Sequence, residues 1–140
     1  MTQLDNIDKI VLRLDKLKEF VKELKEYQGT TRETLEKDSK TAAVVDQMSE
    51  LACESVLDIA RLVVTDQRLK IPEGSKGYIL ALGEAGILDK DFAQEFSKIA
   101  GFRNIDYAEV ADKLNNRLGD FAKFSSQIAR YYEIQMSIEY

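Results

Sequence analysis

The sequence predicts an all-α fold, an up-and-down bundle of four long helices and one short helix. Apolar residues recur at steps of three and four along most of the 140 residues, which is the period of one helix face. One proline, seven glycines and no tryptophan argue against an all-β chain rich in turns. The length suits a single domain over residues 1–140, enough to bury a core without a metal or a disulfide.

The first predicted helix follows an apolar stripe that runs from Leu4 to Tyr27, and Gln28-Gly29 ends it. The second starts near Thr31, because Thr30 and Glu33 have the spacing of a capping box. Its apolar stripe continues without a break to about residue 69. The second half is apolar on both faces, which predicts a position that is buried or covered by a partner.

The middle of the chain holds one clear loop, residues 70–74, because Pro72 lacks an amide donor and biases its predecessor to an extended shape. A short helix over residues 78–82 follows and ends around Gly83 and Gly86. Asp89 can cap a fourth helix, whose apolar positions are Phe92, Phe96 and Ile99.

The last helix opens at Asp106 and Glu109, which have the spacing of another capping signal, and continues to about Ile128. Beyond it lies an apolar C-terminal stretch made of Tyr131, Tyr132, Ile134, Met136 and Ile138. This stretch is either the packed end of the last helix or a tail that docks a partner.

Composition excludes several function classes. The chain has no histidine, which removes His-ligated metals, His-based triads and an imidazole acid or base near neutral pH. Its net charge is −5, with 20 basic and 25 acidic residues spread evenly, so a nucleic-acid surface must be assembled by folding or by pairing two chains. No segment reaches the roughly 18 apolar residues of a membrane span, and Met1 leads into charged residues rather than a secretory signal.

Most candidate sites have a simple structural explanation. Cys53 is the single cysteine, which fits a reducing cytosol and a cytoplasmic location, and its apolar neighbours predict a core residue rather than a nucleophile. The carboxylate pairs Asp8–Glu23 and Asp46–Glu50 are better explained as solvated helix faces than as metal ligands. The glycines of residues 74–86 follow no strand and precede no Gly-Lys-Ser/Thr, so they predict no phosphate loop. We therefore expect no metal and no cofactor.

Arg103 and Asp106 lie where the fourth predicted helix meets the last one. On general grounds, Arg103 is a cation that offsets the dipole at a helix C-terminus, and Asp106 is a cap.

Several segments nevertheless resemble one family in the same helix order. They are residues 52–60 (ACESVLDIA), Ile71-Pro72, residues 80–88 (LALGEAGIL), residues 101–104 (GFRN) and residues 116–121 (NRLGDF). The chain resembles the HepT-like toxins of the HEPN superfamily, which are small all-α ribonucleases of bacterial and archaeal toxin–antitoxin pairs. The resemblance implies a HEPN-like domain, a homodimer whose two motifs face a shared cleft, and RNA as substrate.

The family's motif is an arginine, about four residues, a histidine, one residue and a tyrosine. Arg103 and Asn104 match its opening, but the histidine does not exist here. In one alignment a short piece is missing and Tyr107 is the motif tyrosine. In the other, about eight residues are missing, histidine and tyrosine included, and Asp106 is the family's cap for the last helix. The second alignment needs one gap instead of two and is favoured.

The resemblance implies a mechanism in which an RNA 2′-hydroxyl attacks the adjacent phosphate, the histidine moves the proton and the arginine stabilises the developing charge. This chain is therefore expected to be the toxin subunit of a type VII-like HepT/MntA pair with weak or no ribonuclease activity. Natural loss, selection and engineered deletion of the loop all remain open as its origin. The expected antitoxin is an MntA-like nucleotidyltransferase that adenylylates the motif tyrosine, which makes Tyr107 a candidate for AMPylation.

Two alternatives belong to other classes. One is a non-enzymatic helical interaction module that binds a nucleotidyltransferase, which the lack of histidine favours. The other is a bundle that binds nucleic acid without cleaving it. In that case affinity falls with rising salt and with the substitution Arg103→Ala.

Overall fold

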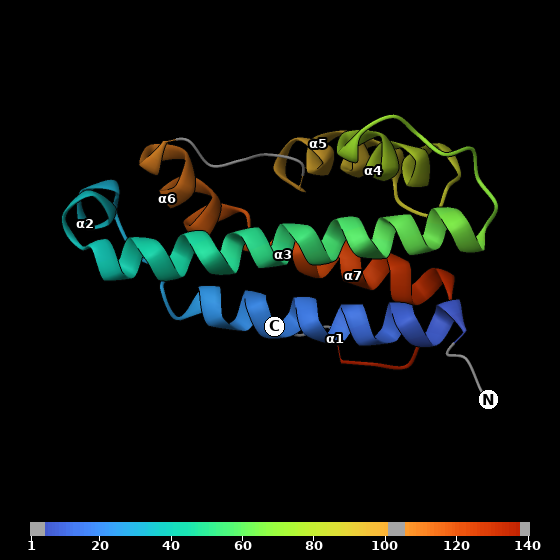
Figure 1. Ribbon diagram of the computed structural model, residues 1–140, viewed down its shortest axis with the longest axis horizontal. Coiled ribbons are helices and arrows are strands. Elements are labelled where there is room, and N and C mark those ends of the chain that lie inside the picture. Colours follow the sequence, from blue (N-terminus) through green and yellow to red (C-terminus); the bar gives the residue numbers. More distant parts are fainter. Residues whose placement is uncertain (1–4, 101–105, 138–140) are drawn as a thin grey trace.

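The computed structural model describes residues 5–100 and 106–137, and within these ranges it consists of seven α-helices and no strand (Figure 1). The all-α prediction is confirmed. The helices are α1 (Asn6–Lys25), α2 (Arg32–Lys37), α3 (Ser39–Asp66), α4 (Ser75–Glu84), α5 (Lys90–Ala100), α6 (Tyr107–Asn116) and α7 (Leu118–Tyr131).

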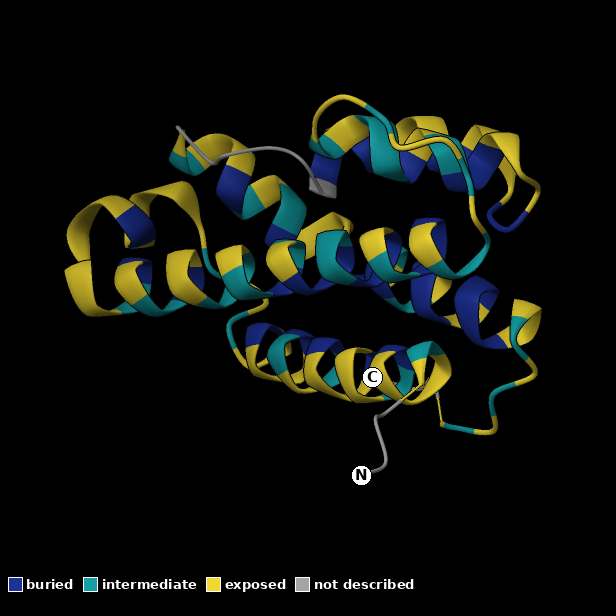
Figure 2. Ribbon diagram, turned by 45° about the vertical axis from the view of Figure 1, so that its right-hand side comes forward, coloured by how far each residue is buried: buried dark blue, intermediate teal, exposed yellow. Residues whose placement is uncertain are grey.

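The two longest helices, α1 and α3, run side by side along the molecule, and α7 packs against α1 (Figure 1). The α4–α5 pair packs against the C-terminal half of α3, while α2 and α6 contact each other at the opposite end. The buried residues of all these helices face a shared interior, and the exposed ones face outward (Figure 2). The two helices that flank residues 101–105 thus belong to different groups, α5 to the pair with α4 and α6 to the pair with α2.

The first helix follows its predicted apolar stripe only in part. Five members of the stripe are buried: Ile10, Leu14, Leu17, Val21 and Leu24. Ile7, at the start of the helix, is 42% exposed. Asp5 caps it, since its side chain accepts a hydrogen bond from the backbone N–H of Asp8 at 2.8 Å. The chain then turns at Gly29, whose φ of 93° lies in the left-handed region that favours glycine.

The second predicted helix is not continuous, because Asp38 divides it into α2 and α3. Asp38 adopts an extended conformation and accepts hydrogen bonds from the backbone N–H of Thr41 at 3.2 Å and from its hydroxyl at 2.9 Å. These bonds to the carboxylate lower the pKa of Asp38. The predicted capping box is also displaced by one residue. Thr31 accepts from the N–H of Thr34, while the hydroxyl of Thr30 donates to the carbonyl of Tyr27.

The last predicted helix is divided in the same way, at Arg117, into α6 and α7. Its predicted cap is confirmed, because Asp106 accepts a hydrogen bond from the backbone N–H of Ala108 at 2.8 Å. Leu114 and Leu118 are buried on either side of the break, so the apolar stripe passes through it.

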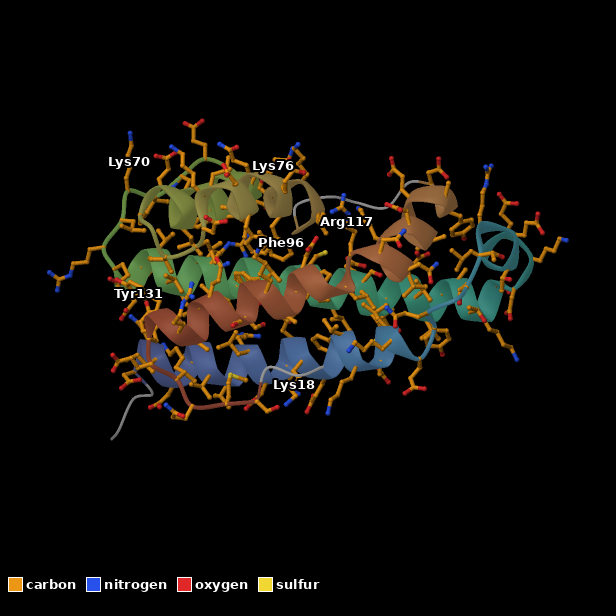
Figure 3. The ribbon with its side chains drawn as sticks, turned by 180° about the vertical axis from the view of Figure 1, so that it is seen from behind. Lys18, Lys70, Lys76, Phe96, Arg117 and Tyr131 are labelled. Carbon is orange, nitrogen blue, oxygen red and sulfur yellow. The ribbon has the colours of Figure 1, made fainter. Side chains whose placement is uncertain are left out.

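Phe96 is the centre of an aromatic cluster that joins α5 to α7 (Figure 3). Its side chain is fully buried. Its ring stacks on those of Phe92 and Phe124, with centroids 5.1 and 5.3 Å away, and meets the ring of Phe121 edge-on at 5.6 Å. Aromatic pairs of this kind stabilise beyond the area that they bury.

The C-terminal stretch packs on the molecule as far as it is described. The hydroxyl of Tyr132 donates to Asp66 at 2.8 Å, and that of Tyr131 donates to Gln67 at 2.6 Å. Ile134 and Met136 lie half-buried against the core. The chain returns along α1, where Lys18 donates to the carbonyl of Ser137 at 3.1 Å (Figures 1 and 3). These residues form a packed end, while Ile138 lies outside the described residues.

Gly83 allows α4 and α5 to approach closely. A Cβ atom at this position would lie 2.7 Å from the Cβ of Ala93, closer than two such atoms can approach. We therefore expect Gly83→Ala to lower the free energy of unfolding by about 1–3 kcal/mol through overpacking. The matched control is Gly119→Ala in α7, where a new Cβ would meet no heavy atom within 4 Å. That variant should be neutral or up to about 1 kcal/mol more stable. Urea denaturation measures both, and equal stability of the two variants would contradict a tight α4–α5 contact.

Candidate functional site at the α5–α6 junction

The sequence-predicted site residues fall on both sides of the boundary of the described chain. Arg103 and Asn104 lie outside the described residues. Tyr107 is the first residue of α6, where it lies half-buried against the core, directly after the cap Asp106. The structure therefore defines this site through the ends of the two helices that flank it.

The C-terminal end of α5 is held against the middle of α3. Ile99 is 9% exposed, and its carbonyl accepts a weak hydrogen bond from the thiol of Cys53 at 3.7 Å. Burial raises the pKa of the Cys53 thiol to about 11, and the charge of Lys113 offsets this only in part. The thiol is protonated at neutral pH, which agrees with a core cysteine rather than a nucleophile.

The C-terminal half of α6 is held by Asn115. Its side-chain oxygen accepts from the backbone N–H of Gly29 at 2.6 Å, and its nitrogen donates to the carbonyl of Thr30 at 3.0 Å. Gln28 adds a longer bond of 3.4 Å to the carbonyl of Leu114. We call the bonds of Asn115 to Gly29 and Thr30 the Asn115 clamp. It fixes α6 to the loop between α1 and α2, independently of α5.

A small cavity lies between the two flanking helices. Its volume of about 20 Å³ has room for about one water molecule. The lining residues come from α1, α3, α5, α6 and α7: Leu24, Ser49, Cys53, Ile99, Val110, Lys113, Leu114, Leu118 and Phe121. Burial here lowers the pKa of Lys113. The cavity is too small for a nucleotide or a cofactor.

Two arginines of the described residues, Arg32 and Arg117, lie on elements close to α6. Arg32 of α2 lies close enough to Asp106 for that carboxylate to help raise its pKa, after the larger effect of its bond to Glu36 at 2.9 Å. Arg117 lies at the turn between α6 and α7, where its side chain extends to the side on which α5 and α6 lie (Figure 3). Its contact with Asp120 is long, 3.9 Å, and exposed. Both cations are thus paired with carboxylates, and Asp106 adds a further negative charge close to Arg32.

The glycines of residues 74–86 have structural roles. Gly74 and Gly86 adopt φ angles of 79° and 75°, before and after α4. Gly77 contacts Pro72, just as Gly83 contacts Ala93. Within residues 5–100 and 106–137, no three His, Cys, Asp or Glu side chains form a group that could hold a metal ion. None of the described helices is long and apolar enough to cross a membrane.

Asn115 is the structurally important residue near the junction that the sequence did not indicate. Its partners lie 85 and 86 residues earlier in the chain, and a single asparagine near a helix end carries no pattern that predicts such a contact. The predicted cap Asp106, by contrast, depends on residues two positions away and was visible in the sequence.

Comparison with known proteins agrees with this architecture. The HepT-like family, described as ribonuclease HepT-like, matches residues 17–128. The mRNA nuclease HepT of Shewanella oneidensis strain MR-1 is 24% identical over 125 residues, which cover 84% of this chain and 93% of that protein. A chain in a crystal structure of a toxin–antitoxin with AMP-PNP shares the fold, with a TM-score of 0.79 at 22% identity over 88% of this chain and 98% of its own length. Because the family match spans most of its length, the chain belongs to the HepT-like ribonuclease family.

Proposed function

We propose that this chain is the toxin subunit of a HepT/MntA-type toxin–antitoxin pair and that its own RNA cleavage is weak or absent. The observation that carries the proposal is the complete lack of histidine in a member of a ribonuclease family. The relative from Shewanella oneidensis is an mRNA nuclease, which supports RNA as the substrate class.

The described side chains near the junction offer no good replacement for an imidazole. The Cys53 thiol is buried with a pKa of about 11. Burial lowers the pKa of Lys113, but the cavity that it lines has room for about one water molecule and not for a ribose. A general acid or base usually contributes about 10²–10⁴ to the rate, so the loss of histidine removes most of the chemistry while Arg103 keeps a charge for phosphate.

RNA cleavage by the purified chain tests the proposal. We expect the cleavage of a labelled RNA to stay at the background rate, and the Arg103→Ala variant to cleave no more slowly than the unmodified chain. A rate above background that Arg103→Ala abolishes would show a working site and would contradict the proposed impairment.

The proposal includes a homodimer and a nucleotidyltransferase antitoxin. Pairing would bring two copies of Arg103 together and so create a local positive site in an acidic chain. The solved relative is part of a toxin–antitoxin, which supports an antitoxin as partner. The capping bond of Asp106 supports the alignment with a single gap, in which Tyr107 is not the motif tyrosine.

Intact mass measurement after incubation with the partner nucleotidyltransferase and ATP tests this part. With the motif tyrosine missing, we expect a dimer that binds the partner and gains no mass. An AMP-sized addition that is lost in Tyr107→Phe would instead identify Tyr107 as the motif tyrosine. A monomer that binds the partner and never binds RNA would favour the alternative function, a non-enzymatic interaction module.

A further inference from the structure

An open groove lies between the N-terminal half of α1 and the C-terminal half of α3, which run side by side at one end of the molecule (Figure 1). We call it the α1–α3 groove, and its volume is about 390 Å³. Its lining residues are Asn6, Lys9 and Arg13 from α1 and Asp58, Arg61, Leu62 and Thr65 from α3. The volume lies in the range of small-ligand sites.

The groove is positively charged in an otherwise acidic chain. Lys9, Arg13 and Arg61 line it together with one carboxylate, Asp58. One oxygen of Asp58 lies 3.6 Å from Nη1 of Arg13, and the other lies 3.4 Å from Nη1 of Arg61. These contacts are long and half-exposed, so they contribute little to stability. Both guanidinium groups nevertheless line the same groove.

The guanidinium of Arg61 is further positioned by an aromatic ring. Its central carbon lies 5.6 Å from the centroid of the Tyr78 ring in α4. The Tyr78 ring restricts the Arg61 side chain, so less conformational entropy is lost when a ligand binds. Each guanidinium has five N–H donors in a planar fork, and the contact with Asp58 involves a single nitrogen of each.

The composition of the groove favours one class of ligand. Among its lining residues in the described chain, Leu62 alone is apolar. The buried centre of a protein interface is depleted of charge, so this lining does not fit the apolar face of a partner helix. Two guanidinium groups and an ammonium match the oxygens of phosphate groups, which arginine binds through two parallel hydrogen bonds.

We propose that the α1–α3 groove binds the phosphodiester backbone of RNA through Arg13, Arg61 and Lys9, as a contact separate from Arg103. The proposal rests on the proposed function, because it assigns a second binding place to the same RNA. Cys53, which contacts the end of α5, and Asp58 are five residues apart on α3. They therefore lie about 8 Å apart along the helix axis and roughly 140° apart around it. A strand bound at the junction reaches the groove by passing around α3.

Binding of a short labelled single-stranded RNA, followed by fluorescence anisotropy at 50 and 200 mM salt, tests the groove. The double variant Arg13→Gln/Arg61→Gln should bind RNA at least about ten-fold more weakly. The slope of its log affinity against log salt concentration should become shallower by an amount that corresponds to about two phosphate contacts. Asp58→Asn should bind several-fold more tightly, because the carboxylate repels phosphate. A purely structural role for Asp58 predicts no tighter binding. The matched control is Lys22→Gln, which removes an exposed cation of α1 outside the groove.

The outcomes separate the groove from the proposed function. If the double variant binds RNA as tightly as Lys22→Gln while Arg103→Ala weakens binding, the groove proposal is overturned and the proposed function stands.

Displacement of RNA by inorganic phosphate in the unmodified chain, with no effect in the double variant, supports the phosphate chemistry. Binding of polyglutamate but not RNA to the groove would overturn the proposal in favour of an acidic protein segment. Thermal melts by circular dichroism should show all variants folded, since the altered side chains are at the surface.

Discussion

Under the proposed function, insertion of a loop with the family's His-x-Tyr sequence after Asn104 should raise the rate of RNA cleavage by about 10²–10⁴-fold. The restored imidazole titrates near neutral pH, so it can take the proton of the 2′-hydroxyl and return it to the leaving oxygen. In the proposed mechanism, Arg103 would supply the charge that stabilises the phosphorane-like transition state. The expected rate profile with pH is bell-shaped or sigmoid around the pKa of the new histidine, which a labelled-RNA assay can follow.

The matched control carries the same insertion with glutamine in place of histidine. It should fold and bind RNA as the restored chain does, and cleave at background. An inert restored chain that still binds RNA would show that descent from a ribonuclease does not explain this protein's present role. That result would favour the interaction module instead.

Phe96→Ala should lower the free energy of unfolding by about 3–5 kcal/mol, the usual cost of removing a buried phenylalanine. Phe96 is fully buried and contacts three other rings, two of them in α7, so the cavity would open between α5 and α7. For a domain of this size the melting temperature should fall by roughly 10 °C. Urea denaturation and thermal melts followed by circular dichroism measure both quantities.

Phe92→Ala is the comparison for this variant. Phe92 is 7% exposed, stacks on Phe96 alone among the described rings and lies under the ammonium of Lys123 at 4.8 Å. Because it lies at the edge of the cluster, the surroundings can relax more easily, and a smaller loss is expected. Equal losses for the two variants would show that Phe96 is not the centre of the contact between α5 and α7.

The sequence predicted the helical class and the buried faces, but not where two of the helices break. Buried residues keep helical spacing across both breaks, with Leu35 and Ala42 around Asp38, and Leu114 and Leu118 around Arg117. An aspartate inside such a stripe can be either an exposed residue within one helix or the cap of a new helix. Which of the two it becomes depends on how the two helices pack, and the apolar period carries no information about that.

For the candidate site, too, the sequence predicted the local features and not the contacts between distant helices. Asp106 and its cap depend on adjacent residues, whereas the Asn115 clamp and the α1–α3 groove depend on contacts between distant helices. Arg13 and Asp58 belong to two separately predicted helices, and no local pattern places them 3.6 Å apart. Arg103 and Asn104 remain predictions from the motif, since they lie outside the described residues.

The Asn115 clamp determines how well the fold tolerates insertions and deletions between α5 and α6. Because α6 is fastened to the loop after α1, and α5 to α3 and α7, neither helix depends on the other for its position. Insertions and deletions between them should therefore be nearly neutral for folding. Under the proposed function, a mutation in this segment would then change RNA cleavage without changing the stability of the fold, and a single insertion would restore cleavage to a protein that had stayed folded.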